Sequence, residues 1–447
     1  MSMMTQAEAD VGMGEAPEVD PHLPPMIATE MGLAPATPTD TRDTGIDPQG
    51  LADLALKAAS LVPSFTTEWA TRKLLLSQVL VAELLEQLRE ERLIEVLGEM
   101  GPLGYRFAIT GRGRERALRL LEISGYVGPA PVSLASYTAM ITWQMAQAPP
   151  ITHEQVQAST RGLVFPEQVL LVAGLAAASG RSLFVHGPPG NGKTSLGRAL
   201  HGALRGDLWI PHCIAVENNI IRVYDPQCHE AIREPFGKEW PIDRRWVQIK
   251  RPHIVVGGEM TMEGFDLIYS PTLRYYEAPL HLKANGGTYL IDDYGRQRVD
   301  PHDLLNRWII PLESQIDYLT LATGQKIQVP FLLRLIIATN LDLGDVTDPA
   351  FLRRMGYKLY LGPPTAEDYA EIFAAYASRR GLDVPPGLLP RLLRRYHEEG
   401  RPLRACEPRD LIERVAEICR YQDRPLTLDE EGIDLAWTGY FGGAATV

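Results

Sequence analysis

The stretch "RSLFVHGPPGNGKTSLGRAL", residues 181–200, constrains the fold more than any other part of the chain. Its apolar start predicts a buried β-strand, its glycine-rich centre a tight loop, and its end the first turns of a helix. Residues 187–194 match the spacing G-x-x-x-x-G-K-[ST], which is typical of a phosphate-binding loop. Glycines there let backbone N–H groups approach a phosphate, and the helix N-terminus adds a partial positive charge.

Each part of this loop has an expected contact with bound ATP. Lys193 is expected to reach the β- and γ-phosphates, and Thr194 to bind Mg²⁺. A chance Gly/Pro turn is the alternative, but the flanking strand and helix argue against it. The predicted ATP-binding residues are Gly187, Pro188, Pro189, Gly190, Asn191, Gly192, Lys193, Thr194 and Ser195.

A second motif, "TYLIDD" at residues 288–293, places two carboxylates at the end of an apolar strand. A phosphate-binding loop needs such a downstream acid to hold the magnesium shell, and Asp292 is the predicted metal residue. Asp293 is the predicted general base for the attacking water. Because Asp is one methylene shorter than Glu, we expect a working but slow reaction.

The order of these and later motifs resembles the AAA+ ATPases over residues 155–425. "LLRLIIATN" is similar to the family's sensor-one strand, which implies that Asn340 positions the attacking water. "DPAFLRRMGYKLYL" resembles the segment with the arginine finger, which implies Arg354, or else Arg353. "EPRDLIERVAEI" resembles the sensor-two helix and implies Arg409.

The segment before the second motif, "YYEAPLHLKANGGTYLIDD", is similar to MoxR-type, enhancer-activator and minichromosome-maintenance members of that family. The activators' loop "GAFTGA" is absent, and the comparable region reads "GGEMTMEGFDLIY". This difference weakens the interpretation of the chain as a transcription activator.

The N-terminal part, "TTEWATRKLLL" to "GRGRERALRLLEI", predicts helix, helix, a strand–Gly–strand wing and a closing helix. This order resembles a winged-helix domain. Its basic and acidic residues balance, and its candidate recognition helix carries Glu83, Glu86, Glu90, Glu91 and Glu95. Phosphate contacts need Lys and Arg, so we favour protein docking over DNA binding.

The expected fold class is α/β, with a parallel-sheet ATPase core and a C-terminal helical lid. Residues 1–46 are rich in proline and acids, with Arg42 as the only Lys or Arg, and predict a disordered acidic tail. The further divisions are a winged-helix domain over residues 47–130, a helical linker over 131–154, the ATPase core over 155–362 and the lid over 363–447.

Composition narrows the class of protein. The net charge of −12 gives no overall attraction to nucleic acid. No run of about 18 apolar residues occurs, so no membrane insertion is expected. The first residues lack the features of a secretory signal, and the four cysteines fit a reducing compartment, so we expect a cytoplasmic protein.

These motifs predict Mg²⁺-dependent ATP hydrolysis by a ring, a homo-hexamer, that remodels or assembles a macromolecular client, with protein favoured over DNA. The arginine finger implies the ring, because it acts on the nucleotide of a neighbouring subunit. The alternatives are a DNA-associated motor or regulator that binds DNA through the winged helix, and an ATP-binding switch that barely hydrolyses.

Two further groups of residues have more than one interpretation. The first group is His212, Cys213, Cys228 and His229. These residues could supply zinc ligands, but their spacing matches no standard zinc site, and Cys is commonly a small buried hydrophobe. The second group, Met260, Met262 and Phe265, could face the channel of a ring or belong to the core.

Overall fold

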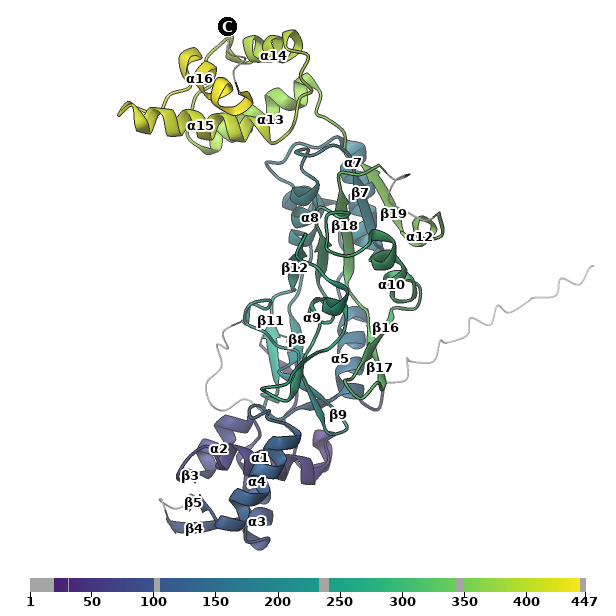
Figure 1. Ribbon diagram of the computed structural model, residues 1–447, viewed down its shortest axis with the longest axis vertical. Coiled ribbons are helices and arrows are strands. Elements are labelled where there is room, and N and C mark those ends of the chain that lie inside the picture. The colour runs from purple at the N-terminus through teal and green to yellow at the C-terminus, as the bar shows by residue number, and fades with distance from the viewer. Residues whose placement is uncertain are drawn as a thin grey trace, which may run out of the picture.

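The computed structural model describes residues 20–30, 32–99, 105–232, 241–342, 344 and 349–442. The molecule is elongated: a helical part at the N-terminal end is followed by a strand-rich part, a part built on a parallel sheet, and a helical C-terminal part (Figure 1). Each part has buried apolar residues of its own. Within the described ranges, no helix is long and apolar enough to cross a membrane.

The sheet unit contains five parallel strands in the order β12–β15–β18–β7–β19. Side chains alternate along a strand, so Leu290 packs into one apolar core and Ile291 into another on the opposite face. The predicted α/β class with a parallel sheet is confirmed. The strands are β7 Leu183–His186, β12 His253–Val256, β15 Thr288–Ile291, β18 Arg334–Thr339 and β19 Tyr357–Tyr360.

Helices cover both faces of this sheet, as buried parallel strands require. One face packs on α6 His153–Ser159, α7 Glu167–Ser179 and α8 Lys193–Gly202. The other packs on α10 Pro301–Ser314 and α12 Pro349–Arg354, with Trp308 and Phe351 fully buried there.

The middle unit is a strand-rich part built largely from segments inserted between the strands of the parallel sheet. Its apolar residues form a separate core that includes Ile214, Trp246 and Leu319. The range predicted as one ATPase core, residues 155–362, is therefore divided between two units. A mixed sheet in the order β13–β14–β10–β9–β6 and the pairs β8–β11 and β16–β17 build the unit.

The elements of the middle unit are mostly short. Its helices are α5 Leu134–Ala146 and α9 Leu280–Lys283, and η2 spans Met262–Phe265 on the side of the sheet unit. The strands are β6 Val132–Ser133, β8 Leu208–Pro211, β9 Cys213–Val216, β10 Asn219–Arg222, β11 Trp246–Ile249, β13 Ile268–Ser270, β14 Tyr275–Glu277, β16 Ile316–Thr320 and β17 Lys326–Pro330.

Helix α5 lies in the segment predicted as a linker, residues 131–154. Tyr137 and Met140 are fully buried in the middle core. The Gln144 side chain donates to the Trp209 carbonyl over 2.9 Å and accepts from the Trp209 N–H over 2.7 Å. The helix is thus a packed element of the middle unit, because its apolar face lies against strands that are distant in sequence.

The N-terminal unit begins where Asp47 caps α1 and Pro48 occupies its first turn. A three-stranded antiparallel sheet, β3–β5–β4, packs beside the helices. The winged-helix resemblance stays a prediction. The elements are α1 Pro48–Ala59, β3 Phe65–Thr66, α2 Thr67–Leu74, α3 Gln78–Glu90, β4 Ile94–Glu99, β5 Tyr105–Ile109 and α4 Gly111–Ile123.

The prediction of a disordered tail over residues 1–46 is wrong for the described part. Strands β1 Met26–Thr29 and β2 Gly32–Pro35 form an antiparallel hairpin, followed by the short helix η1 Arg42–Thr44. Ala34 is buried in the middle core, and the Leu33 carbonyl accepts from the Trp209 indole over 3.1 Å. Residues 1–19 lie outside the described residues.

A buried ion pair ties this N-terminal segment to the middle unit. Asp243 and Arg245 are 2% and 4% exposed and are 2.8 Å apart. Arg245 also donates to the carbonyls of Thr44 and Pro131, over 2.8 and 3.1 Å. One guanidinium therefore holds the N-terminal segment, the start of β6 and the loop before β11 together.

The C-terminal unit is helical, as predicted from about residue 363. Its core includes the fully buried Tyr369, Phe373 and Tyr396. The helices are α13 Ala366–Arg379, α14 Leu388–Glu398, α15 Glu407–Tyr421 and α16 Glu430–Phe441.

Deletion of residues 1–46 is expected to destabilise the protein. It uncovers apolar residues of the middle unit and removes the acceptor of the Trp209 indole, and a buried donor without a partner costs about 1–3 kcal/mol. We expect the midpoint of thermal unfolding to fall by about 5 °C, measured by calorimetry. A chain lacking only residues 1–19 is the control, and an unchanged midpoint in the longer deletion would contradict the argument.

Candidate functional site

The loop between β7 and α8 has a backbone that only glycine adopts readily. Gly187, Gly190 and Gly192 have φ angles of 137°, 83° and 89°, which L side chains rarely reach. A Cβ at Gly187 would lie 2.3 Å from the Leu361 carbonyl oxygen. The glycines therefore permit both the curvature of the loop and its close approach to the chain after β19.

Lys193 starts helix α8 and turns its ammonium group back over the loop. Its Nζ donates to the carbonyls of Gly187 and Pro188 over 2.7 and 2.8 Å. Burial lowers the pKa of Lys193, while the Asp293 and Asp292 carboxylates oppose this shift. The positive charge is thus enclosed by the loop and faced by two acids, close to the place where a phosphate would lie.

Thr194 and Asp292 meet although 98 residues separate them. The Thr194 hydroxyl lies 2.9 and 2.8 Å from the two carboxylate oxygens of Asp292. A hydroxyl and a carboxylate are the hard oxygen ligands that Mg²⁺ prefers, and that ion usually takes few protein ligands besides water and phosphate. The two residues therefore fit a magnesium site of this kind.

Asp293 follows with an unusual backbone. Its φ of 48° lies in the left-handed region, which Asp tolerates better than most residues. Asn340, which follows β18, donates its side-chain amide to the Asp293 carboxylate over 2.9 Å. Gln297 donates to the carbonyls of Asp292 and Asp293 over 3.1 and 3.3 Å and so supports the turn.

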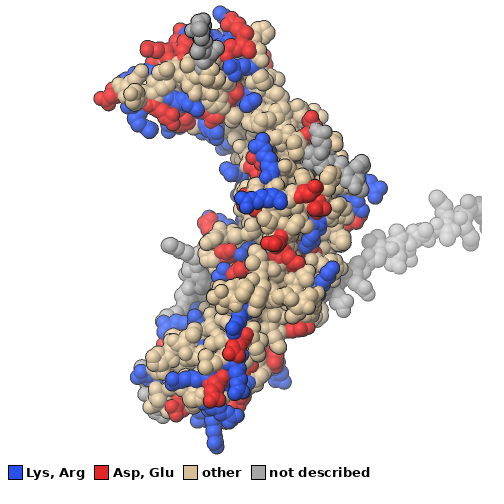
Figure 2. Space-filling model, viewed as in Figure 1, with Lys and Arg blue, Asp and Glu red and all other residues tan. Residues whose placement is uncertain are grey.

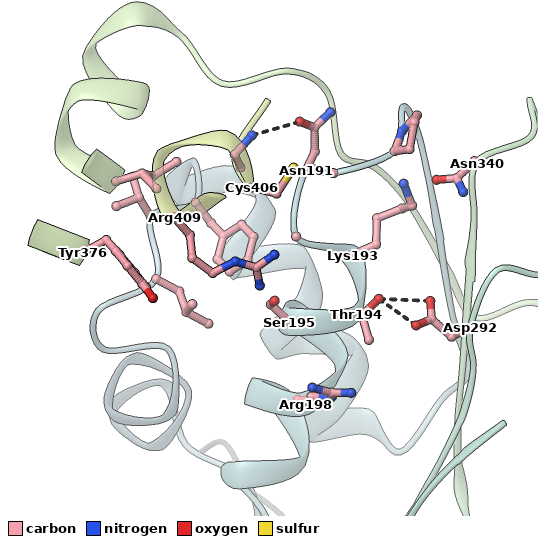
Figure 3. A pocket seen from close by; sticks show the side chains of 18 of the residues that line it. Asn191, Lys193, Thr194, Ser195, Arg198, Asp292, Asn340, Tyr376, Cys406 and Arg409 are labelled. Atoms are coloured by element: carbon pink, nitrogen blue, oxygen red, sulfur yellow. Dashed lines mark hydrogen bonds between the residues drawn. The ribbon is translucent and has the colours of Figure 1, made fainter. Parts of the chain in front are cut away.

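A cavity of about 650 Å³ between the sheet unit and the C-terminal unit is lined by Lys193, Thr194, Asp292, Asp293 and Asn340, among others (Figure 3). Arg409 extends into it from α15, beside Tyr376, and its guanidinium pairs with Asp410 at 2.8 Å. Residues 189–195, Asp292, Asp293, Asn340 and Arg409 are the predicted site residues that line the cavity.

Arg353 and Arg354 are predicted site residues that lie elsewhere. They end helix α12 and do not line the cavity. Arg354 is ion-paired with Glu313 of α10 at 3.5 Å. Within one chain, the arginines do not join the other predicted residues.

Sequence reasoning missed several residues of the cavity. The Arg379 guanidinium donates to the Gly162 carbonyl, so α13 closes onto the segment before α7. No motif marks these positions, because they come from a loop and helices that meet only in the folded chain. The missed lining residues are Gly162, Leu163, Val164, Phe165, Arg198, Arg296, Ile372, Tyr376, Arg379, Ala405 and Cys406.

The possible zinc ligands are not gathered around one point. Cys213 Sγ lies 3.1 Å from the Tyr126 hydroxyl, and His229 Nε2 lies 2.9 Å from the Lys283 carbonyl. Burial lowers the pKa of His212 to about 4, which keeps its ring neutral. Among the described residues, no group of three or more His, Cys, Asp and Glu side chains is placed to hold a metal ion.

The three residues considered for a channel loop differ in their burial. Met260 and Phe265 are buried in the core beside α10. Met262 is 39% exposed. The core interpretation therefore holds for two of the three residues.

Comparisons with known proteins extend these observations only slightly. Residues 365–439, most of the C-terminal unit, match a family model described as a domain of unknown function (DUF8689). No curated protein matches the chain.

Similar solved structures include the RuvB Holliday junction branch migration motor of Thermotoga maritima. That alignment has 16% identity, covers 65% of this chain and 70% of RuvB, and has a TM-score of 0.35. NtrX from Brucella abortus in complex with ATP has 14% identity, coverage of 74% and 70%, and a TM-score of 0.38. At these identities and TM-scores, the two superpositions support no statement about the function of the chain.

Lys193→Ala is expected to abolish ATP binding in a folded protein, because a phosphate would then face only backbone dipoles. Binding is measured by titration of a fluorescent ATP analogue, and folding by circular dichroism. Lys358→Ala, which removes an exposed lysine on β19, is the matched control and should bind normally. Undiminished affinity in folded Lys193→Ala would contradict the assignment.

Proposed function

We propose that the chain is an AAA+-type ATPase that hydrolyses ATP with Mg²⁺. The meeting of Lys193, Thr194 and Asp292 carries this proposal. The lysine and the hydroxyl at the start of α8 meet the carboxylate that follows β15, at the carboxyl ends of the parallel strands, where α/β sheets bind ligands. Arg198 and Arg296 also line the cavity, so its basic groups favour a polyanion.

In this proposal the loop residues Gly187–Ser195 hold the phosphates through backbone N–H groups and the Lys193 ammonium. Thr194 and Asp292 hold Mg²⁺, which would neutralise phosphate charge. Residues 162–165 and helix α13 enclose the other end of the nucleotide. Arg409 reaches in from α15 and contributes positive charge from the C-terminal unit.

Asp293 is the proposed general base. The hydrogen bond from Asn340 orients its carboxylate, and the left-handed φ of Asp293 turns the chain at the mouth of the cavity. Asn340 is in turn proposed to orient the attacking water together with this carboxylate. A general base must lie within hydrogen-bond reach of its water, so the short Asp side chain favours slow hydrolysis.

A ring of identical chains, a homo-hexamer, is proposed because Arg354 and Arg353 lie outside the cavity of their own chain. An arginine that acts on the nucleotide of a neighbouring subunit leaves each lone subunit incomplete. Arg354 is proposed as this finger, with Arg353 as the alternative.

The proposed work of the ring is to remodel or assemble a protein client. The outer side of α3 supports protein over DNA, since Glu83, Glu86 and Glu90 are exposed there and Arg89 is paired with Glu86. Basic and acidic side chains are interspersed over the visible face of the N-terminal unit (Figure 2). The exposed glutamates of α3 repel the phosphates of a DNA duplex, whereas a surface of mixed charge can dock against another protein.

A DNA-associated motor is the second candidate, and helix α4 favours it. Arg112, Arg114 and Arg119 are exposed, and none of them forms an ion pair with another described residue. Duplex retention that falls steeply with salt, and that is lost when these arginines become alanine, would establish this candidate over the first.

Asp293→Asn is expected to bind ATP within about threefold of wild type and to lower phosphate release by about a hundredfold or more. Asn also tolerates the left-handed backbone, so the fold should persist. Asp293→Glu should keep or raise the rate. Asp423→Asn, at an exposed Asp with a φ of 51°, is the matched control.

Equal phosphate release by wild type and Asp293→Asn would remove Asp293 as the base. Turnover measured over a range of protein concentrations separates an enzyme that needs assembly from a switch that barely hydrolyses. If wild type neither binds nor hydrolyses ATP, the proposed function itself fails.

Arg354→Ala is expected to bind ATP normally and to lose turnover by about 10³-fold, because its charge is needed only in the transition state. Mixing it with Lys193→Ala should restore part of the activity, since each chain supplies what its neighbour lacks. Arg353→Ala, treated in the same way, decides between the two arginines. No restoration in mixtures that still assemble would show that Arg354 is not the finger.

A further inference from the structure

A buried acid lies at the start of α15, in the turn that carries the C-terminal unit onto the candidate site. Glu407 is 2% exposed. Its Oε2 accepts from the Tyr396 hydroxyl over 2.8 Å and from the Arg404 N–H over 3.3 Å. The Tyr396 hydroxyl also forms a hydrogen bond of 3.0 Å with the Tyr369 hydroxyl. The Glu407 carboxyl group is therefore anchored to α14 through Tyr396 and, through Tyr369, to α13.

The turn anchored in this way touches the phosphate-binding loop directly. The Cys406 N–H donates to the Gly190 carbonyl over 2.9 Å, and the Ala405 N–H donates to the Asn191 side chain over 3.4 Å (Figure 3). The contact is close, because a Cβ at Gly190 would lie 2.7 Å from Cys406 Sγ. The loop and the C-terminal unit therefore meet through backbone groups of residues 404–406.

Burying a carboxyl group is costly, and a purely structural position is more simply filled by an apolar residue. Burial also raises the pKa of Glu407, an effect that the Tyr396 hydrogen bond opposes. The nearest partners of Glu407 Oε2 are a hydroxyl and a backbone N–H of the turn, and they fix the shape of that turn. These contacts suit a role for Glu407 in directing the N–H groups of Ala405 and Cys406 at the phosphate-binding loop.

We propose that Glu407 is a positioning residue for nucleotide binding: it sets the turn of residues 404–406, which in turn holds Gly190 and Asn191 of the phosphate-binding loop. Glu407 touches no nucleotide, and it acts through Ala405 and Cys406. The same turn begins α15 and so places Arg409 in the cavity. This inference rests on the proposed function of the site, and it adds a direct mechanical link between the C-terminal unit and the loop.

The test compares Glu407→Ala, Glu407→Gln and Glu417→Ala in the full chain, with Glu417 as an exposed acid on the same helix. With Mg²⁺ and a fluorescent ATP analogue, Glu407→Ala should bind about fivefold more weakly, the loss expected for removing a hydrogen bond that holds the loop. Glu407→Gln keeps an acceptor oxygen and should bind within about twofold of wild type, as should Glu417→Ala.

Hydrogen exchange in the phosphate-binding loop provides a readout that a loss of stability confined to the C-terminal unit would not change. Backbone amides of residues 187–193, on a different unit, should exchange faster in Glu407→Ala than in wild type. The effects of Glu407→Ala and Asn191→Ala should be less than additive, because both break the same contact. Fully additive effects, or wild-type affinity and exchange in Glu407→Ala, would overturn the inference.

Should Glu407→Ala fail to fold, Tyr396→Phe carries the test, since it removes the hydrogen bonds of the Tyr396 hydroxyl to Glu407 and Tyr369 and leaves no cavity. We expect a loss of affinity of about threefold in Tyr396→Phe, and unchanged affinity would overturn the inference. If wild type itself binds no ATP analogue, the proposed function has failed, which is a different result.

Discussion

The groups that the sheet unit brings to the phosphate end of the candidate site depend on the parallel register of β7, β18 and β15. Hydrogen bonding pairs His186 with Thr339 and Ile337 with Ile291, so the three strands end at one edge of the sheet. That edge brings the phosphate-binding loop, Asn340 and the two adjacent carboxylates together. A slip of one residue would turn the side chains of a strand to the opposite face and separate these groups.

The middle unit gives the molecule its length and joins the N-terminal unit to the sheet. Its strands come from insertions that are far apart in sequence, and they bury their apolar residues against α5 and the N-terminal hairpin. Arg245 connects three of these segments from one buried position. The N-terminal unit and the sheet unit are therefore joined through packed elements, α5 among them.

The part of the candidate site that carries sequence motifs could be predicted because those motifs are local. The loop from Gly187 to Ser195 and the pair Asp292–Asp293 have spacings that follow from their chemistry, and residues 189–195 line one cavity with the two acids. Glu407, Gln297 and Arg379 could not be found in this way, since each acts on a backbone carbonyl or N–H, groups that every residue type supplies except for the N–H of proline. Such contacts leave no pattern along the chain.

The sequence by itself determined the strand–loop–helix at residues 183–202, the α/β class and the helical C-terminal unit, because periodicity and glycine requirements act over a few residues. Only the tertiary structure decided that residues 26–45 and helix α5 are packed elements. Residues 26–45 have few apolar residues, and the many apolar residues of α5 do not indicate which strands they contact, so a local pattern predicts a tail and a linker. They are buried only because strands more than 60 residues away cover them.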